Sequence, residues 1–166
     1  MSGIVIADSS PLIGLARIGQ LELLHLLYTE IWIPPAVHTE LKPDAQRPGS
    51  QKLKAALEAN WLHVASSDQF SAETCAELLQ SLDLGESEAI ALAEAMNARF
   101  LLIDERKGRM VATRRGLPIA GIGSVLLAAK HHGHIQSIAV ELAALKKAGY
   151  RLSDVLVRKL LELAGE

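Results

Sequence analysis

The chain opens with the stretch Ile4-Val5-Ile6-Ala7-Asp8-Ser9-Ser10-Pro11, which decides how its fold is interpreted. Four apolar residues, rich in β-branched side chains, are typical of a short buried strand. Ser10 is a candidate N-cap and Pro11 suits the first helical position, so a helix should follow at once and stop at Gly19. The stretch therefore predicts a β–α unit with an acidic residue, Asp8, at its turn.

The same alternation of short apolar strands and amphipathic helices continues along the chain. Further strands are expected at 31–33, 62–65, 100–103 and 117–120. Helices are expected at 21–28, 36–41, 52–60, 71–82, 86–97, 106–115, 124–131, 138–148 and 153–163. This alternation predicts an α/β fold with a mostly parallel sheet of four or five strands covered on both faces. In such sheets ligands bind beyond the C-terminal ends of the strands.

Length and composition narrow the class of protein. A chain of 166 residues with 49% hydrophobic and 22% charged residues is typical of a single globular domain, and excludes a disordered or collagen-like chain. One cysteine, Cys75, excludes a disulfide framework and indicates a reducing compartment. The sequence has no run of about 18 apolar residues and no signal peptide, so we expect a cytoplasmic protein without a membrane partner.

Five acidic residues form the candidate site. Asp8 and Asp104 each follow a predicted strand, and parallel strands bring such ends to one edge of the sheet. Glu40 ends the helix after the second strand, while Glu86 and Glu88 begin the helix that leads to the Asp104 strand. The topology therefore predicts that carboxylates distant in sequence lie close together.

Carboxylates gathered in this way repel one another unless they bind protons or a cation. All-oxygen ligands suit Mg²⁺ or Mn²⁺, and the sequence has no Cys/His spacing for Zn²⁺. It also lacks a Walker phosphate loop, a dinucleotide fingerprint and a nucleophile elbow. The expected chemistry is metal-assisted hydrolysis of a phosphodiester, in which the metal activates water and stabilises the leaving oxygen.

Each candidate also has a simpler interpretation. Asp8 can cap a helix, and Glu86 can complement a helix dipole. Because Glu86 and Glu88 are two residues apart on a helix, at most one should be a direct ligand. The basic run that follows Asp104 is either a solvated helix face or a contact to phosphate. The candidate substrate-binding residues are Ser9, Arg106, Lys107 and Arg109.

Four motifs, in order, resemble those of PIN domains. They are the stretches Ile4–Leu12, Pro34–Leu41, Gly85–Ala93 and Leu101–Glu105. The resemblance runs from residue 4 to about residue 130. It is strongest to an uncharacterised branch of the family that is related to the VapC-type toxins of toxin–antitoxin pairs.

The resemblance implies a PIN-like α/β/α sandwich and an Mg²⁺- or Mn²⁺-dependent endoribonuclease. It also implies a homodimer, RNA as substrate and a small antitoxin protein as inhibitor. Asp8, Glu40 and Asp104 match the acidic positions of the family directly, and the pattern favours Glu88 as the third acid, with Glu86 as an alternate ligand. Residues 1–135 would form the nuclease domain, and 136–166 a helical extension packed on that domain or on a partner.

One departure from the family pattern and the low net charge keep other functions open. Leu102 stands where many PIN domains have Thr or Ser, which favours a catalytically weak or inactive module that binds nucleic acid or a protein. A phosphohydrolase of small phosphate esters is a third hypothesis. The net charge of −2 disfavours RNA, but setting the five site carboxylates aside leaves seventeen basic and fourteen acidic residues. RNA binding is therefore expected to be local and metal-dependent.

Overall fold

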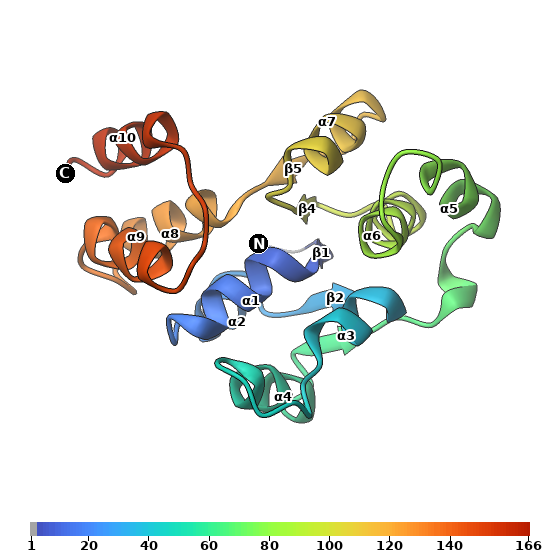
Figure 1. The fold of residues 1–166 in the computed structure, drawn as a ribbon, viewed down its shortest axis with the longest axis horizontal. Helices are drawn as coiled ribbons and strands as arrows, with labels where there is room; N and C mark the ends of the chain where they lie inside the picture. The colour runs from blue at the N-terminus through green and yellow to red at the C-terminus, as the bar shows by residue number, and fades with distance from the viewer. Residues whose placement is uncertain (1–2) are drawn as a thin grey trace.

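Five short strands form one all-parallel sheet in the computed structural model, which describes residues 3–166 (Figure 1). They are β1 (Val5–Ala7), β2 (Ile31–Ile33), β3 (Leu62–Val64), β4 (Phe100–Leu102) and β5 (Ile119–Ala120). The strand order is β3-β2-β1-β4-β5, so the first strand of the chain is the central strand of the sheet. The predicted α/β class and the parallel sheet are confirmed.

In the part of the chain that the structure describes, ten helices connect and follow these strands. They are α1 (Ser9–Arg17), α2 (Glu22–Tyr28), α3 (Pro35–Leu41), α4 (Ser50–Glu58), α5 (Ala72–Leu78), α6 (Leu84–Ala95), α7 (Arg106–Arg114), α8 (Ile122–His131), α9 (Ile138–Lys147) and α10 (Asp154–Leu163). A short 3₁₀ turn, η1 (Ser67–Gln69), was not expected from the sequence. Within residues 3–166, no helix has the length and apolar character needed to cross a membrane.

The start of α1 differs from the prediction. The helix begins at Ser9, and Asp8 rather than Ser10 occupies the N-cap position, so the prediction for Ser10 is wrong. The Asp8 side chain makes no capping hydrogen bond. Asp8 therefore has the extended backbone of an N-cap residue, but its carboxylate is not used to cap α1.

The two faces of the sheet pack against different helices, as the two-residue period of a strand requires. Val5 and Ala7 of β1 lie in one core with side chains from α1, α2, α8 and α9, whereas Ile6 between them lies in a second core with α5, α6 and α7. Figure 1 shows these two groups of helices on opposite sides of the strands. This is the α/β/α layering of a PIN-like fold.

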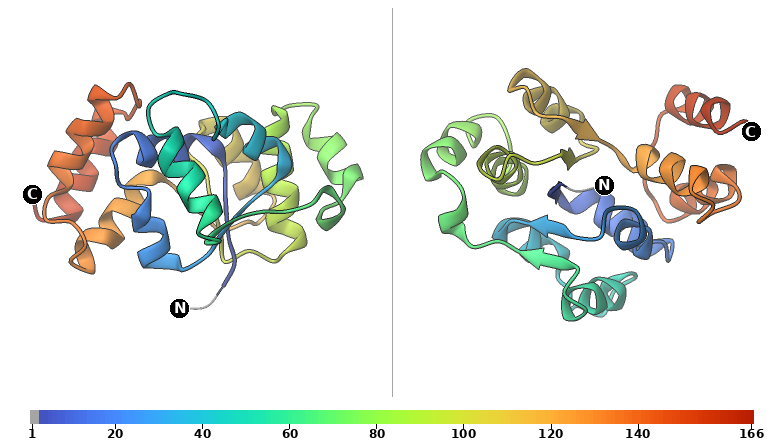
Figure 2. Two further views of the ribbon diagram at one scale, coloured as in Figure 1. Left: turned by 90° about the horizontal axis from the view of Figure 1, so that it is seen from below. Right: turned by 180° about the vertical axis from the view of Figure 1, so that it is seen from behind.

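The C-terminal helices α9 and α10 pack on the first core. Leu142 and Leu145 of α9 and Leu160 of α10 are buried in it together with Leu126 of α8. Figure 2 shows α8, α9 and α10 gathered at one end of the molecule. The side chain of Glu166 links the C-terminus to α8 and α9. It accepts hydrogen bonds from Lys130 Nζ, Ser137 Oγ and the Ile138 N–H, each 2.7 Å long.

Candidate active site

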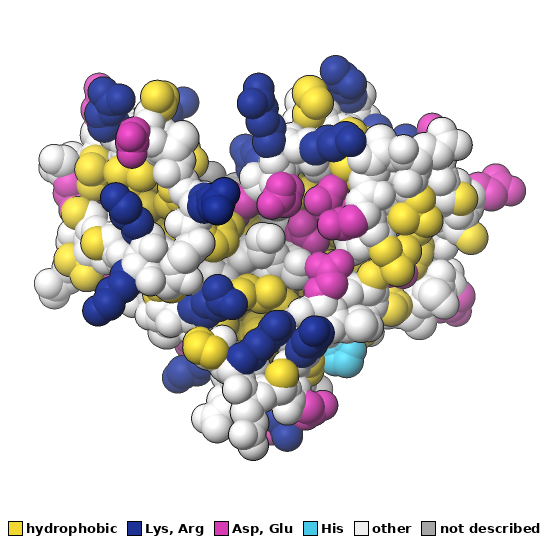
Figure 3. Space-filling view, in the orientation of Figure 1, with side chains coloured by type: hydrophobic (Ala, Val, Ile, Leu, Met, Phe, Trp, Pro, Cys, Tyr) yellow, Lys and Arg dark blue, Asp and Glu magenta, His cyan; other side chains and the backbone are white. Residues whose placement is uncertain are grey.

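The candidate site lies where the central strands β1 and β4 end. Ala7 and Leu102 are register partners, and the Asp8 N–H donates to the Leu102 carbonyl at 2.9 Å. Asp8 follows β1 directly, and Asp104 lies two residues beyond β4. Figure 3 shows acidic side chains gathered near the middle of this face, between α6 and α7. The parallel topology thus brings together carboxylates that are separated by most of the chain.

Asp8 is the most deeply buried of these acids, with only 3% of its surface exposed. Burial is the main cause that raises its pKa to about 7; the negative charges of Glu40, Asp83 and Glu105 act in the same direction, while a hydrogen bond from the Ser9 N–H opposes the shift. Apart from burial, the groups that shift its pKa are one backbone N–H and three carboxylates. A buried carboxylate with negative neighbours is one that a cation would stabilise strongly.

Glu40 reaches this cluster from the last turn of α3. The Ser9 hydroxyl donates to Glu40 Oε2 at 2.6 Å, which fixes that carboxylate beside Asp8. Its other side lies against Gly85 in the first turn of α6, where a Cβ would overlap the carboxylate. Only a glycine at position 85 leaves room for the Glu40 carboxylate, which explains why the Gly85-Glu86-Ser87-Glu88 motif begins with glycine.

The two glutamates of α6 have different surroundings. The helix begins with Asp83 as N-cap, whose Oδ1 accepts the Glu86 N–H at 2.8 Å. Burial raises the pKa of Glu86 to about 7, and Asp83, Asp8 and Glu105 add to the shift. Glu88 points elsewhere, since its Oε2 accepts the Ala36 N–H at the start of α3, 2.9 Å away.

Asp104 is held by two hydrogen-bond donors. The Ile122 N–H, at the start of α8, lies 3.1 Å from Oδ2 and 3.2 Å from Oδ1, and the Tyr150 hydroxyl donates to Oδ2 at 2.6 Å. Burial raises the pKa of Asp104, whereas Tyr150, Ile122 and the nearby Arg109 guanidinium oppose the shift. Asp104 is therefore a restrained carboxylate, unlike Asp8.

Comparison with known proteins identifies the fold family. The profile of a PIN-domain family, DUF3368, matches residues 4–166. The chain belongs to the PIN-domain family. A PilT N-terminus domain protein from the hyperthermophilic archaeon Sulfolobus solfataricus P2 has a similar structure, with a TM-score of 0.52 and 18% sequence identity. The alignment covers 76% of this chain and 92% of that protein. No curated protein matches the chain in sequence.

Three side chains of this PIN domain join the site without having been predicted. Asp83 and Glu105 both raise the pKa of Asp8 and of Glu86, so they lie within the electrostatic reach of the cluster. Each had a signal in the sequence: Asp83 precedes a helix as an N-cap, and Glu105 adjoins Asp104. Tyr150 is distant from every acidic motif, and nothing local in the sequence indicates its role.

Among residues 3–166 of this PIN domain, some basic side chains bond to other protein groups, and others are exposed without such a bond. Arg109 Nη1 donates to the Ile103 carbonyl at 2.7 Å and is half-buried, while Arg115 pairs with Glu94. Arg106 and Lys107 are exposed at the start of α7. Figure 3 shows Lys and Arg side chains bordering the acidic cluster on the α7 side. Arg106 and Lys107 are thus the exposed basic side chains that lie nearest to Asp104 in sequence.

The donor set of this PIN domain fits a hard divalent cation in its chemistry. The cluster consists of carboxylates and a hydroxyl, which are the ligand types that Mg²⁺ and Mn²⁺ prefer. Within residues 3–166, no three His, Cys, Asp or Glu side chains are already arranged around a common metal position. The side chains therefore supply suitable ligand atoms without a preformed three-residue metal position among the residues that the structure describes.

Proposed function

We propose that this PIN domain is a divalent-metal-dependent endoribonuclease that hydrolyses RNA phosphodiester bonds. The observation that carries the proposal is that Glu40 and Glu86 both lie within electrostatic reach of the buried Asp8 beyond the central strand, in a family whose fold is that of nucleases. Burial, with a smaller contribution from neighbouring carboxylates, raises the pKa values of Asp8 and Glu86, so a bound divalent cation would stabilise their ionised forms.

Asp8, Glu86 and Asp104 would hold Mg²⁺ or Mn²⁺. When bound, the ion supplies a more acidic water and stabilises charge on the leaving oxygen. Glu40, fixed by the Ser9 hydroxyl next to Asp8, orients the attacking water through its carboxylate and accepts its proton. Glu88 does not belong to this set in our proposal, because its Oε2 accepts the Ala36 N–H.

The border of the site supports an extended anionic substrate. Arg106 and Lys107 are exposed at the start of α7, close in sequence to Asp104, and their charges suit phosphate groups on either side of the cleaved bond. The toxin role, the homodimer and the small antitoxin partner remain predictions of the family resemblance.

The decisive experiment is Mn²⁺-dependent cleavage of a labelled RNA by wild type and Asp8→Asn. We expect the variant to lose at least about 100-fold in rate, because an amide cannot replace a charged ligand. Glu73→Gln, which neutralises an exposed acid on α5, is the matched control and should cleave like wild type. Equal cleavage by wild type and Asp8→Asn would overturn the proposal.

The second candidate function is a PIN-fold module that binds nucleic acid or protein without catalysis. The absence of a closed ligand set among residues 3–166 favours it. Calorimetric titration with Mn²⁺ separates the two functions: the nuclease takes up metal in a manner that depends on Asp8, and the binding module does not.

A further inference from the structure

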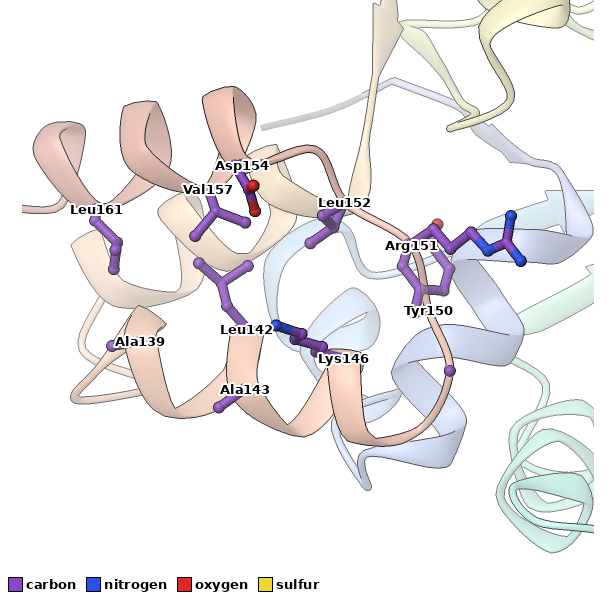
Figure 4. A pocket seen from close by; sticks show the side chains of 11 residues that line it. Ala139, Leu142, Ala143, Lys146, Tyr150, Arg151, Leu152, Asp154, Val157 and Leu161 are labelled. Atoms are coloured by element: carbon purple, nitrogen blue, oxygen red, sulfur yellow. The ribbon is translucent and has the colours of Figure 1, made fainter.

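Tyr150 links the C-terminal helices to the acidic site. It lies in the connector between α9 and α10, and its hydroxyl donates to Asp104 Oδ2 at 2.6 Å across 46 residues of sequence. Figure 4 shows Tyr150 at one end of the pocket between these helices, beside Arg151 and Leu152. A residue outside the four acidic motifs thus contacts one of the predicted metal ligands.

The aromatic ring is held independently of that hydrogen bond. A Cβ on Gly14 of α1 would lie 2.8 Å from both Tyr150 Cδ2 and Cε2, closer than real contacts allow. The ring therefore packs directly on the backbone of α1, at a position where any larger residue would displace it. Ring packing and the hydroxyl contact are separable, because the first needs only the ring and the second needs only the oxygen.

The hydroxyl adds a restraint that the backbone alone does not give to Asp104. The Ile122 N–H lies at nearly equal distances, 3.1 and 3.2 Å, from the two carboxylate oxygens, so it allows the carboxylate to rock between them. Tyr150 bonds only Oδ2 and so selects one orientation. A ligand fixed in this way loses less conformational entropy when it binds a metal.

We propose that Tyr150 is a positioning residue that orients Asp104 for divalent metal, which makes the C-terminal segment part of the active site. This inference rests on the proposed function only in taking Asp104 as a metal ligand. Hydrogen-bond partners of ligating carboxylates typically contribute a factor of about 10 to 100 in metal affinity.

The test is Tyr150→Phe, which removes the hydroxyl and keeps the ring on Gly14. Mn²⁺ affinity is measured by calorimetry without RNA, and cleavage is measured separately. We expect Mn²⁺ affinity to fall by about 10-fold or more, with the thermal midpoint and the KM for RNA near their wild-type values and kcat reduced at fixed Mn²⁺. Tyr28→Phe is the matched control, because Tyr28 packs on Phe100 away from the acids.

A double-mutant cycle shows whether Tyr150 acts through Asp104. In an Asp104→Asn background, Tyr150→Phe should cause little further loss of Mn²⁺ affinity. Wild-type Mn²⁺ affinity in Tyr150→Phe, or additive losses in the cycle, would overturn the inference. If wild type binds Mn²⁺ and cleaves no RNA, the proposed function fails while the affinity comparison still decides the role of Tyr150. A wild-type protein that binds no Mn²⁺ overturns both.

Discussion

Glu86 and Glu88 lie two residues apart at the start of α6 and are equally buried, each with 9% of its surface exposed. The pKa of Glu86 is raised to about 7 by burial and by the charges of Asp83, Asp8 and Glu105. Glu88 instead accepts the Ala36 N–H and so satisfies the N-terminus of α3. Two glutamates with the same degree of burial thus have different surroundings: Glu86 faces other carboxylates, and Glu88 faces a hydrogen-bond donor.

The difference teaches that burial alone does not identify a functional acid. A buried carboxylate that accepts a helix N–H stabilises the fold, since it meets a group that lacks a partner within the helix. A buried carboxylate among other carboxylates destabilises the metal-free protein, which makes it a candidate for a functional role. Asp8 resembles Glu86 in this respect, whereas Asp104 has donors of its own.

The largest expected effect comes from neutralising the two glutamates one at a time. Glu86→Gln should lower Mn²⁺-dependent RNA cleavage by a factor of about 100 to 1000, because it removes a charged ligand. Glu88→Gln should cleave within about threefold of wild type, since its amide oxygen can still accept the Ala36 N–H. Initial rates over a range of Mn²⁺ concentrations measure both variants.

The opposite result would reverse the assignment. A large loss in Glu88→Gln with little change in Glu86→Gln would show that Glu88 is the ligand, as the family pattern in the sequence favours. Circular dichroism of both variants excludes unfolding as the cause of either loss.

The next effect is the pH dependence of stability in the metal-free protein. Asp8 and Glu86 have pKa values of about 7 when folded, against ordinary values of 3.8 and 4.5. The folded state therefore binds more protons than the unfolded state between about pH 4 and 7, and its stability falls as pH rises through this window. We expect the thermal midpoint in EDTA to drop by several degrees from pH 5 to pH 8.

Variants at the same two glutamates provide the control. Glu86→Gln should raise the midpoint at pH 8 and flatten the pH profile, whereas Glu88→Gln should keep the wild-type slope. Mn²⁺ should restore stability at pH 8 in wild type, because it binds the ionised carboxylates of the folded state. A midpoint that is constant or rises from pH 5 to pH 8 would contradict the raised pKa values.

Most of the fold could be predicted because the strands are short, apolar and separated by amphipathic helices. The run 100–103 is the clearest strand pattern after the first, and β4 is found at Phe100–Leu102. The turn at Asp8 could not be placed in detail, because Ser10 is as good a helix cap as any residue nearby. The helix begins at Ser9, whose hydroxyl donates to Glu40, a contact between segments distant in sequence that the local pattern does not show.

The site could be predicted in outline for a similar reason. Strand order brings Asp8 and Asp104 to one edge, and this follows from parallel topology alone. The family pattern favours Glu88 over Glu86, but the local sequence gives no environment that distinguishes the two side chains. Packing of α3 against α6 makes the difference, through the Ala36 N–H. Tyr150 depends on packing between helices that are distant in sequence, so no motif could reveal it.

The smallest expected effect tests the same turn of α6 at Gly85. In Gly85→Ala the new Cβ overlaps the Glu40 carboxylate, and that flexible side chain must move away. We expect RNA cleavage to fall about 3- to 10-fold because Glu40 no longer lies in its place beside Asp8. Stability should change by less than about 1 kcal/mol, since alanine favours a helix by a similar amount. Ser87→Ala is the matched control, because the Ser87 hydroxyl is buried with no hydrogen-bond partner among residues 3–166. If Gly85→Ala cleaves like Ser87→Ala, the position of Glu40 against α6 has no part in the reaction, and Glu86 is then the sole contribution of this turn to the site.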